Sequence, residues 1–141
     1  AYKQIADTYN DNVYTGDFYA KSGVMSHWFY LLANGGSGTN HNNISYTVYG
    51  LGLDEAAKVV FEGQTGHFAN VTSYSGARSA MVDAANILYG TNSFQSLQVA
   101  NAWYAVGVGT NPGQVIMSGA DLVCYSGSTF TANNPTSSTI S

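Results

Sequence analysis

The side chains best suited to chemistry in this chain are its three histidines, His27, His41 and His67. Histidine is the commonest metal ligand, and a catalytic zinc often takes two histidines four residues apart on a helix, as in His-Glu-x-x-His. The three histidines lie too far apart in sequence for that motif. A zinc site that the fold assembles from all three is the open alternative. The more ordinary interpretation places His27 on the flank of the first helix, as a boundary residue with a partly solvated ring, and His41 in a flexible loop.

Other reactive groups lack the neighbours that their chemistry needs. Cys124 is the only cysteine, which excludes an internal disulfide. A catalytic thiol requires a nearby base, and no motif surrounds Cys124, so it is a buried thiol or has a partner outside these 141 residues. The carboxylates are scattered, and Asp54 with Glu55 is better explained by helix capping than by acid–base chemistry. Gly50-x-Gly52 lacks the third glycine and the Lys-Ser/Thr of a phosphate loop, and there is no nucleophile elbow.

The composition is unusually poor in charge. Charged residues make up 9% of the chain, against about 25% in ordinary soluble domains. The net charge is −4, and there are only four basic residues, Lys3, Lys21, Lys58 and Arg78. So few cations argue against nucleic acid and against anionic membrane surfaces as partners. No apolar run approaches the roughly 18 residues that span a bilayer. Eleven tyrosines on an uncharged polar background suit a secreted, extracellular protein.

Four helical patterns could position these groups. Their expected N-caps are Ser22, Asp54, Ser75 and Ser93. Gly35-Gly36 and Gly90 should end the first and third helices, and the second should stop near Glu62 because Gly63 weakens it. Each helix has an expected apolar face. For the first helix it is Val24, Met25, Trp28, Phe29, Leu31 and Leu32, and for the second Ala56, Ala57, Val60 and Phe61. For the third it is Ala77, Ala80, Met81, Ala84, Ala85 and Leu88, and for the fourth Val99, Ala102, Trp103 and Val106.

The remaining segments predict loops and short strands. Residues 36–45 have the composition of a polar loop, and residues 46–49 of a short strand. After Gly107 the period changes to about two, which predicts strands at 115–117, 122–125 and 129–131. The sequence therefore predicts a mainly α fold, a compact bundle of about four helices with a short β-strand C-terminal extension. The expected domains are 1–109, with a loop-rich lead-in over 1–21, and 110–141, a linker and the first strands of a truncated β-sandwich.

Several short segments, in order and at natural spacing, carry a family resemblance. They are Ser22-Gly23-Val24, Tyr30 to Gly36, Gly50 to Lys58, Leu88-Tyr89-Gly90 and Ala105-Val106-Gly107-Val108. Together they resemble the C-terminal helical subdomain of thermolysin-like (neutral) zinc metallopeptidases. The segment after Gly113 resembles the start of an immunoglobulin-like β module, in which Cys124 would pair outside this chain.

The resemblance implies a catalytic histidine and a zinc site, and this chain departs from both. In the family motif Asp-Asn-Gly-Gly-aliphatic-His-x-Asn-Ser-Gly, counting back from Ser22-Gly23 puts Tyr19 at the histidine position, and the preceding loop is shortened. The family's zinc lies in an N-terminal half, so no cofactor is expected in this chain, and zinc only with that half. A tyrosine hydroxyl can still donate a hydrogen bond to an oxyanion, which makes Tyr19 the single candidate catalytic residue.

Two functions follow from these departures. The first is the C-terminal half of a secreted peptide-hydrolysing enzyme, which is inactive by itself. Its partner is the N-terminal catalytic half of the same protein. It meets a peptide substrate only if the whole enzyme is active. The second is a non-catalytic extracellular module, for structure, assembly or adhesion, whose partners are other copies of itself.

Overall fold

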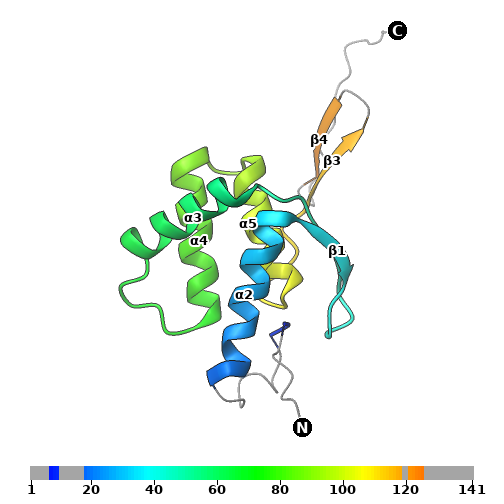
Figure 1. Cartoon of the computed structure of the whole chain (residues 1–141). Helices are drawn as coiled ribbons and strands as arrows, with labels where there is room; N and C mark the ends of the chain where they lie inside the picture. Colours follow the sequence, from blue (N-terminus) through cyan, green and yellow to red (C-terminus); the bar gives the residue numbers. More distant parts are fainter. Residues whose placement is uncertain (1–6, 10–17, 119–120, 126–141) are drawn as a thin grey trace, which may run out of the picture.

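The computed structural model describes residues 7–9, 18–118 and 121–125 of the chain. The elements in chain order are α2 (Phe18–Asn34), β1 (Gly36–Thr39), β2 (Ser45–Val48), α3 (Leu53–Gly66), α4 (Tyr74–Tyr89), α5 (Phe94–Ala105), β3 (Gln114–Ser118) and β4 (Asp121–Tyr125). Helix α3 packs on α4, α4 on α5, and α2 on both α3 and α5. Figure 1 shows this bundle with the β1–β2 hairpin along one flank. The predicted mainly α bundle of four helices is confirmed for the described residues.

The core lies where small side chains let these helices approach. Trp28 of α2 stacks on Trp103 of α5 with ring centroids 4.7 Å apart. Helices α4 and α5 contribute buried alanines to the core, namely Ala77, Ala80, Ala84, Ala85, Ala100, Ala102 and Ala105. The expected apolar face of the fourth helix is confirmed in full, and that of the third except for Leu88, which is exposed. On α2, Val24, Trp28, Leu31 and Leu32 are buried, and Met25 and Phe29 pack partly buried against the core.

The predicted helix starts are partly wrong. Ser93 does cap α5, because its Oγ accepts from the N–H of Ser96 at 3.1 Å. Helix α4 is capped by Ser73 instead of Ser75, with the Ser73 Oγ accepting from Gly76 N. Helix α2 begins at Phe18, one turn before the predicted cap Ser22. Ser73 and Ser75 give the same local capping signal two residues apart, so sequence alone misplaces such a boundary.

Helix α3 departs from prediction at both ends and on its face. Its N-cap is Gly52, and it runs through Gly63 to Gly66 instead of stopping near Glu62. Gly63 is buried, and a Cβ built there would meet the Met81 sulfur at 2.6 Å. Close contact with α4 therefore offsets the low helix propensity of glycine. The buried face follows Ala56, Val59 and Gly63, which leaves the predicted core residues Ala57 and Phe61 exposed.

The segment predicted as a loop over residues 36–45 forms half of a hairpin. β1 pairs antiparallel with β2, from Gly36 opposite Val48 to Thr39 opposite Ser45. The predicted strand at 46–49 is thus confirmed as β2 within one residue. The sequence Gly-Ser-Gly-Thr of β1 carries no apolar alternation, so its strand character comes from pairing and not from its own side chains.

The C-terminal strands form a separate hairpin. β3 pairs antiparallel with β4, with Gln114 opposite Tyr125 and Val115 opposite Cys124. Two of the three predicted strands are confirmed in position, and the third, at 129–131, lies outside the described residues. The boundary near residue 109 and the immunoglobulin-like module stay predictions.

Candidate functional site

Tyr19, the candidate catalytic residue, lies in the first turn of α2. The helix begins at Phe18 and carries Tyr19, Ser22 and Gly23 in continuous helical backbone. The residue that the resemblance would place at the histidine position is therefore a helical residue at the N-terminal end of α2. Its chemical role stays a prediction.

The fold brings two of the three histidines to one residue, Asp7. His27 Nδ1 lies 3.0 Å from the Asp7 backbone oxygen, and His41 Nδ1 lies 3.2 Å from Asp7 Oδ1. Each contact requires the ring nitrogen to donate, since neither acceptor carries a proton in its usual state. The expected places are confirmed, since His27 is half-buried within α2 and His41 lies in the turn between β1 and β2. His67 lies elsewhere, at the C-cap of α3.

The residues that the structure describes do not fit a zinc site. Among them, no three His, Cys, Asp or Glu side chains are arranged to hold a metal ion. His27 faces a backbone oxygen, and the His41–Asp7 pair is largely exposed. An exposed pair of this kind contributes about 0–1 kcal/mol. The contacts of Asp7 are therefore best explained as structural, because they join the lead-in to α2 and to the β1–β2 turn.

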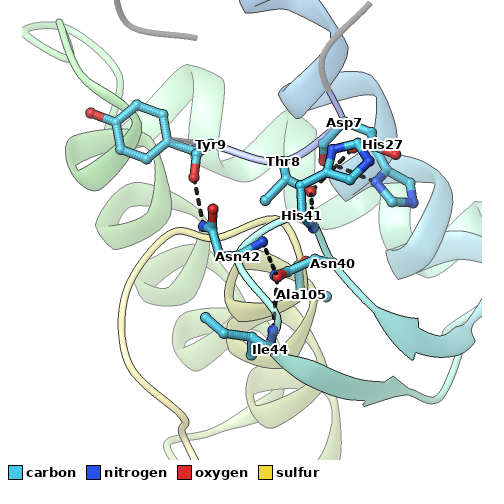
Figure 2. Close-up of polar contacts among 9 residues, drawn as sticks. All are labelled: Asp7, Thr8, Tyr9, His27, Asn40, His41, Asn42, Ile44 and Ala105. Carbon is cyan, nitrogen blue, oxygen red and sulfur yellow. Dashed lines mark hydrogen bonds and ion pairs between the residues drawn. The ribbon is translucent and has the colours of Figure 1, made fainter. Parts of the chain in front are cut away.

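Asn40 is the centre of this polar network, which Figure 2 shows in close-up. Its Nδ2 donates to the Ala105 oxygen at 2.9 Å, at the end of α5. Its Oδ1 accepts from the backbone N–H of Asn42 at 2.9 Å and of Ile44 at 3.1 Å. One buried side chain thus shapes the β1–β2 turn and ties that turn to α5.

The lead-in residues Thr8 and Tyr9 join the same network. Tyr9 N donates to the Val106 oxygen, and Asn42 Nδ2 donates to the Tyr9 oxygen at 2.9 Å. Gly107 has φ +86°, and a Cβ there would lie 2.6 Å from the Tyr9 oxygen. The close approach therefore requires glycine at 107. The sequence did not predict these contacts between the lead-in, the β1–β2 turn and the end of α5. Their only local signal was the cluster of turn-forming asparagines at 40, 42 and 43.

A pocket of about 590 Å³ opens beside Tyr9. Its walls come from the lead-in, α2, the α3–α4 connection and the start of α4, and consist of Tyr9, Met25, Phe68, Val71, Thr72, Ser73, Tyr74 and Ala77. The rings of Tyr9 and Tyr74 meet edge to face at 5.2 Å and 61°. Burial, and to a lesser degree the neighbouring Tyr9, raises the pKa of Tyr74 above its ordinary value.

Comparison with known proteins identifies the fold. Residues 1–108 match the profile of the thermolysin metallopeptidase, alpha-helical domain. The chain belongs to this family. Within the family zinc is the catalytic metal, and the helical domain seen here does not contain the zinc site.

Thermolysin-family relatives align with the same region. The transglutaminase-activating metalloprotease of Streptomyces mobaraensis is 39% identical over 66% of this chain. Bacillolysin of Bacillus cereus is 37% identical and neutral protease B of Bacillus subtilis (strain 168) is 32% identical, each over 66% of this chain. The chain spans 13% of the first relative's length and 16% of the other two.

None of the helices that the structure describes has the length and apolar character to cross a membrane.

Alkaline pH is expected to destabilise this thermolysin-family domain through Tyr74. A raised pKa means that the folded state keeps the phenol proton where the unfolded chain has lost it. The stabilisation is complete below the unfolded value near 10 and is lost as the pH rises through the folded value. Urea unfolding between about pH 9 and pH 11 should show a shallower alkaline loss in Tyr74→Phe than in the native chain. Tyr30→Phe, at an exposed tyrosine, controls for loss of a hydroxyl, and an unchanged slope in Tyr74→Phe would contradict the assignment.

Proposed function

We propose that this chain is the C-terminal helical half of a secreted thermolysin-like zinc metalloendopeptidase, and that the 141 residues alone do not hydrolyse peptide bonds. The observation that carries the proposal is the family match over residues 1–108, in a chain without His-Glu-x-x-His. The role of this half is to supply one wall of a substrate cleft. The metal and its ligands would come from the N-terminal half of the same protein, which is the partner we propose.

Tyr19 supports a weakened or absent catalytic step. At the family's histidine position the group that stabilises the oxyanion is a neutral phenol instead of an imidazole. Loss of one oxyanion donor typically lowers kcat by about 100–1,000-fold. The short loop before Phe18 adds to the effect, since a displacement of about 1 Å in a catalytic group can cost about 100-fold.

The proposed setting is extracellular. The low charge, the eleven tyrosines and the net charge of −4 support a secreted protein that binds neither nucleic acid nor membranes. The names of the relatives, proteases of Bacillus and Streptomyces, agree with a role in peptide hydrolysis for the whole protein.

The test is an assay of the purified chain on casein with added zinc. We expect no hydrolysis above the buffer blank, with thermolysin as the positive control. Tyr19→His should be equally inactive, because one histidine cannot supply a zinc site that needs at least three protein ligands. Zinc-dependent casein cleavage by the native chain, abolished by a chelator, would refute the proposed inactivity.

The alternative is a non-catalytic extracellular module for structure, assembly or adhesion. Exposed large apolar side chains favour it, among them Leu53, Phe61 and Ile87, which are 66%, 69% and 62% exposed. Exposed apolar groups of this size on a weakly charged surface support association with other copies of the chain. Sedimentation velocity decides between the two: concentration-dependent oligomers favour the module, and a strict monomer removes it.

A further inference from the structure

We propose that the pocket beside Tyr9 is a binding site for a small uncharged aromatic group. This inference goes beyond the proposed function, because none of the pocket's walls is a residue that we connect with peptide hydrolysis. The pocket joins four parts of the chain, namely the lead-in at Tyr9, α2 at Met25, the α3–α4 connection and the first turn of α4.

The size of the pocket suits a small molecule. Its volume is about 590 Å³, and ligand pockets in proteins range over about 300–1,000 Å³. The pocket is open to solvent, since Thr72 and Ser73 in its wall are exposed, so a ligand can enter it. The space accommodates one or two aromatic rings with a short substituent.

The walls favour an aromatic ring over other apolar groups. Phe68, Tyr9 and Tyr74 provide three aromatic rings, and the Tyr9–Tyr74 pair already adopts the edge-to-face geometry at 5.2 Å. A further ring can join such an arrangement, gaining about 0.5–1.5 kcal/mol per aromatic pair beyond its buried area. Met25 adds a thioether, which packs favourably against aromatic rings.

The absence of charge in the lining restricts the ligand further. The lining that the structure describes contains no acidic or basic side chain. A tyrosine phenol is neutral at physiological pH, and burial raises the pKa of Tyr74 further above its ordinary value. The polar side chains of this lining carry only hydroxyls, and the Ser73 hydroxyl already caps α4 by accepting from Gly76 N. Within this described lining an anion finds no basic partner and a cation finds no carboxylate, which favours an uncharged ligand.

The test compares p-cresol with 4-methylcyclohexanol, which has the same substituents on a saturated ring. Each is titrated into the ¹⁵N-labelled chain while amide shifts are followed at Met25 and at Phe68 to Ala77. We expect saturable shifts with p-cresol and a Kd of about 1 mM, as suits a ligand of this size. The saturated analogue should bind about threefold or more weakly. Absence of saturation by about 20 mM, or equal affinity for the two compounds, would overturn the proposal.

Two variants locate the binding. Thr72 is exposed at the pocket, so Thr72→Phe should fill the pocket without disturbing the core, and weaken p-cresol about tenfold. The matched control Ser79→Phe adds the same ring to an exposed site of α4 outside the lining, and should leave the affinity within about twofold. Val71→Thr makes the wall polar at nearly constant volume and should also weaken binding. Unchanged affinity in both pocket variants would place the binding elsewhere and refute the assignment.

Discussion

Replacing Asn40 with leucine is expected to lower the free energy of unfolding by about 3 kcal/mol or more. The Asn40 side chain makes three hydrogen bonds, one donated to the Ala105 oxygen and two accepted from the N–H groups of Asn42 and Ile44. Asn40 is buried, so leucine would leave these backbone groups without their side-chain partner. Each net hydrogen bond contributes about 1 kcal/mol, and an orphaned buried group costs more. Urea unfolding followed by tryptophan fluorescence measures the loss.

Two further variants test the reason for the loss. Asn42→Ala removes one hydrogen bond from an exposed side chain, and should cost about 1 kcal/mol or less. Asn40→Asp keeps both acceptor contacts but loses the donor to Ala105. Burial raises the pKa of such a carboxyl, so the penalty relative to the native chain should be largest at neutral pH and should shrink as the pH falls through the raised pKa towards about 4, because the protonated group can donate. If Asn40→Leu costs no more than Asn42→Ala, the proposed role of Asn40 is wrong.

The sequence predicted best where one local signal acts alone. The i, i+3, i+4 alanine pattern of α4 and the Ser93 cap of α5 required no tertiary information, and both agree with the structure. The sequence failed where packing overrides propensity. Gly63 stays helical because it lies against Met81, and β1 is extended because it pairs with β2. Neither effect can be seen in the residues themselves.

The candidate site divides in the same way. Tyr19 was found only through a family resemblance, since nothing in its spacing marks it. The network around Asn40 escaped prediction because its bonds join distant residues: Asn40 and Ala105 are 65 positions apart, and Asn42 and Tyr9 are 33 apart. Contacts of that range follow from the completed fold and have no periodic signature in the chain.

Replacing Gly50 with alanine is expected to cost about 3 kcal/mol or more, because the chain crosses the end of α2 at van der Waals contact there. A Cβ on Gly50 would lie 2.5 Å from the Asn34 carbonyl carbon, 2.6 Å from Gly35 N and 2.7 Å from the Ala33 oxygen. All three atoms are backbone, so no side chain can rotate away. Thermal or urea unfolding of Gly50→Ala measures the effect.

The crossing at Gly50 also satisfies the last carbonyls of α2. Leu51 N donates to the Leu32 oxygen at 2.8 Å and Gly52 N to the Ala33 oxygen at 3.0 Å. Displacing residue 50 should therefore break helix-end hydrogen bonds as well as create a clash. Gly66→Ala is the matched control, since a Cβ there would lie 3.4 Å from the flexible Glu62 carboxylate, and this variant should be neutral or stabilising by up to about 1 kcal/mol. Equal midpoints for the two variants would show that the chain can move away from α2 at Gly50, and that the end of the helix is not fixed by this crossing.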